Sequence, residues 1–173
     1  PPPQHPSCRG ARPTLTPRTA SAPNPQLNQP PTVLATTTMQ HKLTAAILGA
    51  GQISAFHLRA LKRLPNVEII AIADLNTSRA RTLADTFAIK HVCSSLADLL
   101  NHHPDVIHIL TPPHAHAENA VEALAAGSHV YVEKPLATSV DDCDRIAAAA
   151  QAAGRTVCIG HSLLRDPFIT RAL

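Results

Sequence analysis

The chain has 173 residues, with 15 Lys and Arg against 12 Asp and Glu, and it contains one tyrosine, three phenylalanines and no tryptophan. This length predicts a single folded domain. So few aromatic side chains exclude the stacking platforms of single-strand nucleic-acid binders. No apolar run approaches the roughly 18 residues that a membrane span needs, so neither nucleic acid nor a membrane is an expected partner.

Residues 1–40 differ in composition from the rest of the chain. They are rich in Pro, Ser, Thr, Gln and Asn, and they contain three arginines but no acidic residue. Such a segment cannot bury enough apolar surface to offset its ordering entropy, so we expect a disordered arm. Met39 is the only methionine, and we interpret it as the natural start. A transit peptide is the alternative, which the prolines disfavour because they interrupt an amphipathic helix.

Without the three arginines of the arm, the remaining chain carries equal numbers of basic and acidic residues. The basic balance of the whole chain therefore belongs to the arm. It does not indicate a basic binding surface on the folded part.

The most informative segment is the apolar run 43–48 followed by Gly49-Ala50-Gly51-Gln52-Ile53-Ser54. It predicts a buried strand, a Gly-x-Gly-x-x-Ser turn, and a helix whose first amides and positive dipole end suit a pyrophosphate. Gly49 permits the tight turn, and Gly51 leaves no Cβ in the path of the phosphates. Ser54 replaces the usual third Gly or Ala and is small enough for close helix–strand packing.

A second apolar run, 67–73, ends at Asp74, which lies 23 residues after Gly51. That separation is near the ~20 residues expected of a carboxylate that binds the adenosine ribose. The carboxylate would accept hydrogen bonds from both ribose hydroxyls of NAD and repel the 2′-phosphate of NADP, so NAD is favoured over NADP. Asp74 could instead cap the next helix, but Asn76 and Ser78 already serve that purpose.

The rest of the chain alternates between strand and helix patterns. Strands are predicted over 43–48, 67–73, 89–93, 106–110, 128–132 and 156–159, and helices after residue 54, up to about 86, over 96–100, over about 115–126 and over 139–153. Such alternation predicts an α/β fold with a doubly wound parallel Rossmann sheet, here over residues 41–162. The notable polar clusters follow the strands, at the edge where such sheets bind ligands.

Three segments together resemble the glucose-fructose oxidoreductase / inositol dehydrogenase (Gfo/Idh/MocA) family. They are Gly49–Ile53 with Asp74, the stretch Thr111–His116, and the stretch Ala126–Ala137 that contains Glu-Lys-Pro. The similarity runs from about residue 43 to 173. Members are NAD(P)-dependent oxidoreductases of sugars, cyclitols and related polyols. The resemblance implies hydride transfer between nicotinamide and a sugar-like carbinol, and a homo-oligomer in the complete protein.

The resemblance also implies roles for individual residues. Lys134 would be catalytic, because it would contact the reacting hydroxyl and the nicotinamide ribose and assist proton transfer. Pro135 would hold the turn rigid, in the family often through a cis peptide bond, and Thr111, Pro112 and His116 would line the cofactor groove. The full set of implied cofactor contacts is Gly49, Ala50, Gly51, Gln52, Ile53, Asp74, Thr111, Pro112, His116, Glu133, Lys134 and Pro135. The alternative for Glu133-Lys134 is a solvated ion pair at a strand end.

The histidines and cysteines predict no metal site. His102, His103, His108, His114 and His116 are close in sequence but lack the helical spacing, with a carboxylate, of a metal centre. Cys93, Cys143 and Cys158 are widely spaced and odd in number, which is typical of reduced thiols in a cytoplasmic protein.

Residues 163–173 correspond to the start of a truncated substrate domain, the domain that in the family supplies a catalytic histidine and a nearby aspartate. The sequence therefore contains most of a cofactor site and little of a substrate site. Two alternatives to a portion of an oxidoreductase stay open: a non-catalytic dinucleotide-binding module, and a fragment completed by a partner chain.

Overall fold

The structure is a computed structural model that describes residues 42–161 and Arg171. The expected arm over residues 1–40 lies outside the described residues. So does the expected start of a substrate domain at 163–173, with the exception of Arg171. No helix among the described residues is long and apolar enough to cross a membrane.

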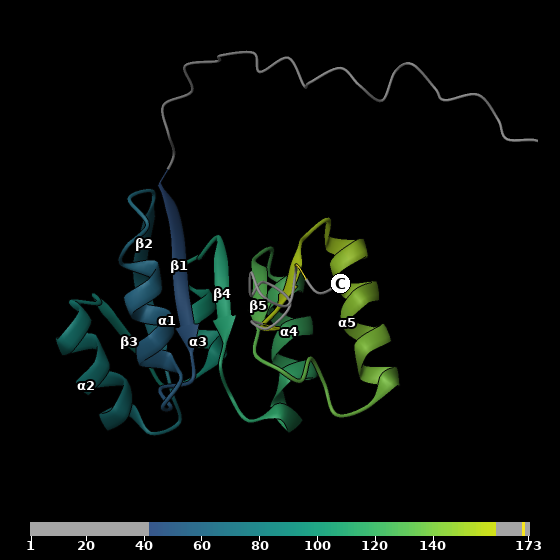
Figure 1. Ribbon diagram of the computed structural model, residues 1–173, viewed down its shortest axis with the longest axis horizontal. Helices are drawn as coiled ribbons and strands as arrows, with labels where there is room; N and C mark the ends of the chain where they lie inside the picture. The colour runs from purple at the N-terminus through teal and green to yellow at the C-terminus, as the bar shows by residue number, and fades with distance from the viewer. Residues whose placement is uncertain (1–41, 162–170, 172–173) are drawn as a thin grey trace, which may run out of the picture. The chain divides into compact units, whose positions relative to one another are not determined.

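Six parallel strands form one sheet in the order β3-β2-β1-β4-β5-β6 (Figure 1). The strands are β1 Leu43–Leu48, β2 Val67–Ala73, β3 His91–Cys93, β4 Val106–Ile109, β5 His129–Val132 and β6 Val157–Ile159. The predicted doubly wound parallel sheet is confirmed. Because the strand order reverses between β1 and β4, the connections that leave their carboxyl ends diverge, and a crevice opens there.

Helices cover both faces of the sheet (Figure 1). They are α1 Ser54–Leu61, α2 Thr77–Phe87, α3 Leu96–Leu100, α4 His116–Ala125 and α5 Val140–Ala153, with a 3-10 turn, η2, at Pro113–Ala115. One core layer packs α1 and α2 against the sheet, and the other packs α3, α4 and α5 against the opposite face.

The central strand β1 shows why the sheet is buried on both faces. Ala46 and Leu48 belong to one core layer, and Ala45 and Ile47 belong to the other. Successive side chains of a strand point to opposite faces, so a strand covered by helices on both sides must be apolar throughout.

The strand predicted over 89–93 begins only at His91. The preceding helix α2 ends at Ala88 in a left-handed conformation, with φ of 52°. The amide of Ile89 then donates to the carbonyl oxygen of Ala84, so this residue closes the helix and does not pair in the sheet. The Ile89 side chain is nevertheless buried in the core, which explains its apolar character.

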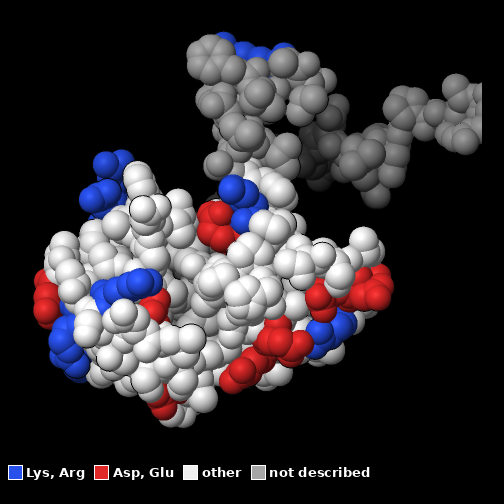
Figure 2. Space-filling view, turned by 90° about the horizontal axis from the view of Figure 1, so that it is seen from below, with Lys and Arg blue, Asp and Glu red and all other residues white. Residues whose placement is uncertain are grey.

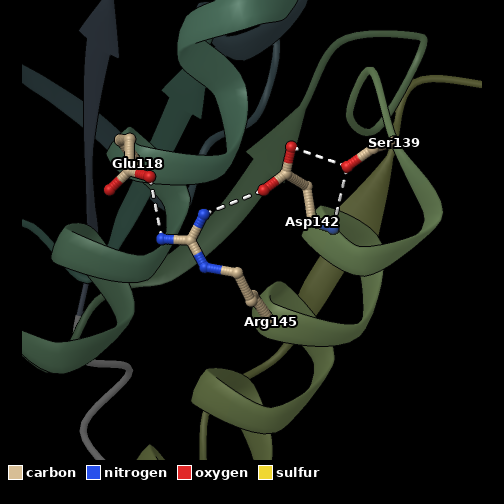
Figure 3. Close-up of polar contacts among 4 residues, drawn as sticks. All are labelled: Glu118, Ser139, Asp142 and Arg145. Carbon is tan, nitrogen blue, oxygen red and sulfur yellow. Dashed lines mark hydrogen bonds and ion pairs between the residues drawn. The ribbon is translucent and has the colours of Figure 1, made fainter.

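The start of α5 is fixed by a small polar network (Figure 3). The Ser139 hydroxyl accepts from the amide of Asp142 and donates to the Asp142 carboxylate. Arg145 donates to Asp142 on its own helix and to Glu118 on α4. These hydrogen bonds from Ser139 and Arg145 lower the pKa of Asp142. The network joins α5 to α4 directly after the segment that contains Glu133, Lys134 and Pro135.

Candidate functional site

A cleft of about 750 Å³ lies at the carboxyl ends of β1, β2, β3 and β4. Its wall includes Gly49 after β1, Asp74 after β2, Ser94 after β3 and Thr111 after β4. Figure 2 looks onto this edge of the sheet, where charge is sparse over the middle, while Asp and Glu gather on the side of α4 and α5. The cleft therefore occupies the place where open α/β sheets bind their ligands.

Gly49 and Gly51 contribute to the cleft in different ways. Gly49 has φ of +104°, and a Cβ there would lie 2.7 Å from the carbonyl oxygen of Leu110, so only glycine fits. A Cβ on Gly51 would meet no atom of the described residues within 4 Å. Gly51 is thus not required by packing within the protein. The open space beside it is what the close approach of a ligand to the backbone would need.

Ser54 closes the glycine turn. Its side chain is 0% exposed, and its hydroxyl donates to the carbonyl oxygen of Gly49 over 2.6 Å. The sequence predicted only that Ser54 is small enough for close packing, and the structure adds this hydrogen bond. No side chain of the described residues caps the start of α1. The amides of Ser54 and Phe56 donate to the carbonyl oxygens of Gly51 and Ile53. The amides of Gln52 and Ile53, just before the helix, make no hydrogen bond within the described residues, so these are the ones that suit an anion in the cleft.

Asp74 holds the glycine turn against the end of β2. One carboxylate oxygen accepts from the amide of Ala50 at 2.6 Å, and the other accepts from the amide of Asn76 at 2.7 Å. Each oxygen keeps a lone pair for a further donor, such as a ligand hydroxyl. The N-cap of α2 is Asn76, which accepts from the amide of Arg79, so Asp74 does not cap that helix.

The other predicted cofactor contacts divide into two groups. Gln52, Ile53, Thr111 and Pro112 line the cleft with Gly49, Gly51 and Asp74. Ala50, Glu133, Lys134, Pro135 and His116 do not line it. Arg79 on α2 also contributes to the wall.

His116 lies beneath the cleft and not on its surface. Its side chain is 1% exposed, with Nε2 2.8 Å from the Thr111 carbonyl oxygen and Nδ1 2.8 Å from that of Pro135. Carbonyl oxygens only accept, so the ring satisfies both when both nitrogens carry a proton. His116 therefore joins the end of β4 to the turn after β5. The sequence led us to expect it on the surface of the cofactor groove, not in this buried position.

The turn after β5 carries Glu133, Lys134 and Pro135. The Lys134–Pro135 peptide bond is cis. The Lys134 side chain is exposed, and its backbone amide donates to Glu133 Oε2 at 3.0 Å. The other carboxylate oxygen, Oε1, lies 3.4 Å from Nε2 of His57 on α1. The Glu133-Lys134 pair is thus tied to the protein through Glu133, while the lysine ammonium group faces outward.

Gly160, after β6, makes room for this arrangement. A Cβ there would lie 2.9 Å from Glu133 Oε1 and 3.0 Å from the Tyr131 hydroxyl oxygen. Sequence reasoning missed His57, because it lies far from Glu133 in the chain and belongs to no motif that contains it. Among residues 42–161 and Arg171, no three or more His, Cys, Asp or Glu side chains are arranged to hold a metal ion.

Comparison with known proteins agrees with this geometry. Residues 43–161 match the model of an oxidoreductase family described by an NAD-binding Rossmann fold. The chain is 35% identical over 131 residues to the uncharacterized oxidoreductase YrbE of Bacillus subtilis, covering 75% of this chain and 38% of the relative. It is 39% identical over 122 residues to inositol 2-dehydrogenase of Salmonella paratyphi B, covering 68% of this chain and 36% of the relative.

A solved structure shows the same fold. The WlbA dehydrogenase of Chromobacterium violaceum, in complex with NADH and UDP-GlcNAcA, superposes with a TM-score of 0.73 at 26% identity. The match covers 78% of this chain and 39% of that one. The chain thus spans about two fifths of the length of the proteins that it matches.

Proposed function

The chain belongs to the Gfo/Idh/MocA oxidoreductase family, as its sequence predicted, and from this premise we propose that it holds NAD in the cleft beside Gly49, Asp74 and Thr111. The observation that carries the proposal is the Asp74 carboxylate. Two backbone amides hold it in the cleft wall, with lone pairs left for a ribose. The cradle fits the cofactor, because it combines an uncapped helix start, an open Gly51 and this carboxylate.

We assign each part of the dinucleotide to a part of the cleft. The pyrophosphate would lie at the turn before α1, where the amides of Gln52 and Ile53 have no partner within the described residues and Gly51 offers no Cβ. The adenosine ribose donates to Asp74, whose negative charge disfavours a 2′-phosphate even though Arg79 lies in the same wall. Leu75, 96% exposed, is an apolar side chain that the adenine ring would cover.

For the complete enzyme, we propose NAD-dependent oxidation or reduction of a sugar- or cyclitol-type carbinol. Bound NAD would supply the hydride acceptor. Lys134 Nζ would hold or release the proton of the substrate hydroxyl, while His116 and Glu133 keep its turn in place. The substrate class rests on the inositol 2-dehydrogenase relative and on the sugar nucleotide bound to WlbA.

Assembly and location belong to the same proposal. We place the complete protein in the cytoplasm as a homo-oligomer. The free thiols of Cys93, Cys143 and Cys158 support a reducing compartment. The second candidate function is a dinucleotide-binding module without catalysis of its own, or one completed by a partner chain, which would use the same cleft.

Titration with NADH, followed by its fluorescence, tests the proposed cofactor site. Asp74→Ala is expected to weaken NADH binding by at least tenfold and to raise the relative affinity for NADPH, because the carboxylate that distinguishes the two is gone. Lys134→Ala is expected to bind NADH nearly as the unaltered chain does. Asp85→Ala, at an exposed site on α2, is the matched control. Equal affinity of Asp74→Ala and Asp85→Ala would remove Asp74 from the site.

A further inference from the structure

A second polar cluster lies on the face of the sheet that α1 covers, beside the turn that carries Lys134. It consists of His57 on α1, His108 on β4, and Tyr131 and Glu133 on and after β5. We call these four residues the imidazole cluster. None of them lines the proposed NAD cleft.

The imidazole cluster is held together by short contacts. Nδ1 of His57 lies 3.0 Å from Nδ1 of His108, and Nε2 of His57 lies 3.4 Å from Glu133 Oε1. The Tyr131 ring stacks on His108, with centroids 4.9 Å apart and planes 14° apart, and it meets the His57 ring edge-on at 5.2 Å. Both ring nitrogens of His57 therefore have a polar partner, and the Tyr131 ring packs against both imidazole rings.

Both imidazoles are neutral at neutral pH. Burial, and then the proximity of His57, lowers the pKa of His108 to about 4. Burial also lowers the pKa of His57, although the charge of Glu133 and its hydrogen bond act in the opposite direction. A neutral imidazole has one nitrogen that donates and one that accepts.

These facts fix the direction of the two hydrogen bonds that His57 makes. The Glu133 carboxylate only accepts, so Nε2 of His57 must carry the proton and donate to it. Nδ1 of His57 is then an acceptor, and Nδ1 of His108 must be the donor of the bond between the two rings. The geometry thus assigns the Nδ1–H tautomer to His108 and the Nε2–H tautomer to His57.

We propose that His57 is a positioning residue for the turn that carries Lys134, and that Glu133 fixes the tautomer of His57 and, through it, that of His108. Oε1 of Glu133 is fixed by His57, and Oε2 is fixed by the Lys134 amide. The carboxylate consequently has one orientation beside the lysine. Because α1 starts at the glycine turn, the helix that follows the proposed phosphate site also supplies the ring that contacts Glu133.

The catalytic meaning of this arrangement rests on the proposed function, but the tautomers do not. They are measured on the ligand-free 173-residue chain, labelled with ¹⁵N-histidine, by NMR correlation of ring nitrogens with ring protons. Near pH 7.5 we expect a protonated Nδ1 and a bare Nε2 for His108, and the reverse for His57. The exposed His114 serves as a reference, with averaged signals. Any other assignment for His57 or His108 overturns the proposal.

Substitutions at His108 and Glu133 test the causal part. Glu133→Gln replaces the carboxylate by an amide that can accept or donate, so the His57 and His108 signals should become averages of two tautomers, and His114→Leu should leave them unchanged. His108→Leu keeps Glu133, so His57 should keep its Nε2 proton. Glu133→Gln should also lower the pKa of His57 further, because the carboxylate raises it. A single unchanged His57 tautomer in Glu133→Gln, or a switched His57 tautomer in a folded His108→Leu chain, contradicts the proposal.

The proposed function fails in a different experiment. The imidazole cluster lies outside the cleft, so His108→Leu should bind NADH within about twofold of the unaltered chain, a difference well below 1 kcal/mol. A chain with the expected tautomers that binds no NADH would refute the cofactor assignment alone. A chain that binds NADH with the wrong tautomers would refute the positioning proposal alone.

Discussion

The two halves of the sheet hold their polar side chains in different ways. Around β1 and β2, Ser54 and Asp74 bond to backbone atoms of the glycine turn. Around β4 and β5, His57, His108 and Glu133 contact one another across elements far apart in the chain. Backbone partners fix the shape of a loop, whereas side-chain partners fix the orientation of particular groups. The first half is therefore suited to cradle a ligand, and the second is suited to orient a reactive turn.

The largest effect that distinguishes the halves is expected at the glycine turn. Gly49→Ala should cost about 3 kcal/mol or more of the free energy of unfolding, because φ of +104° and a carbonyl oxygen 2.7 Å from the new Cβ both oppose it. Urea denaturation measures the loss. Gly51→Ala is the matched control, since its Cβ has open space, and it should lower NADH affinity with little change in stability. If both substitutions prove equally destabilising, the turn does not depend on Gly49 in the way described.

The polar contacts around β4 and β5 should make the free energy of unfolding depend on pH. The pKa of His108 is about 4 in the folded chain and near 6.5 when unfolded, so the unfolded chain binds the extra proton between these values. Stability should be full above pH 6.5 and should fall as the pH drops toward 4, by up to roughly 3 kcal/mol. The lowered pKa of His57 acts in the same direction.

Urea denaturation between pH 4.5 and 7 measures this slope, above the range in which the lowered pKa values of Asp98 and Asp142 matter. His108→Asn should flatten the slope, while His114→Asn should preserve it. A slope as steep in His108→Asn as in the unaltered chain would assign the proton uptake to another group.

His116 belongs to the β4–β5 half but bonds to backbone atoms, since its ring joins the end of β4 to the turn after β5. His116→Ala leaves the carbonyl oxygens of Thr111 and Pro135 without that partner, and it should cost about 2 kcal/mol of stability. It should also weaken NADH binding, because Thr111 lines the cleft. Asp85→Ala, at an exposed site on α2 outside the cleft wall, is the control. Equal affinities of the two variants for NADH would confine His116 to a purely structural function.

The smallest effect is expected at the network between α4 and α5. Ser139→Ala removes the N-cap of α5 and should cost about 1 kcal/mol, measured by thermal and urea unfolding. Arg145→Ala should cost less and should depend on salt, because its ion pairs with Asp142 and Glu118 are exposed. A larger loss for Arg145→Ala than for Ser139→Ala would mean that the bridge between helices outweighs the cap.

The same contrast explains what the sequence could predict. The glycine turn, the strand–helix alternation and the position of Asp74 are local patterns, and their structural consequences follow from backbone sterics and from periodicity. The hydrogen bond from Ser54 to Gly49 is also local. The sequence did not predict it, because a serine in place of the motif's usual third Gly or Ala indicates only a small side chain.

The polar contacts of the other half join distant residues. The contact of His57 with His108 spans 51 positions, and the bond from His116 to Pro135 spans 19. Which of several histidines is buried, and against which partner, depends on the packing of α1 and α4 on the sheet. No spacing rule contains that information, which is why His57 was missed and His116 was expected on the surface of the groove and not beneath it.

The most direct test of the central claim is an NMR titration of the ¹⁵N-labelled chain with NAD, with amide shifts followed residue by residue. We expect saturable shifts at Gly49–Ile53, Asp74–Asn76 and Thr111, and unchanged shifts at the opposite edge of the sheet. A smaller hollow of about 160 Å³ lies at that edge, lined in part by Asp105, Gly127 and His129. Saturable shifts confined to that hollow, or no saturation at any amide, would contradict the account.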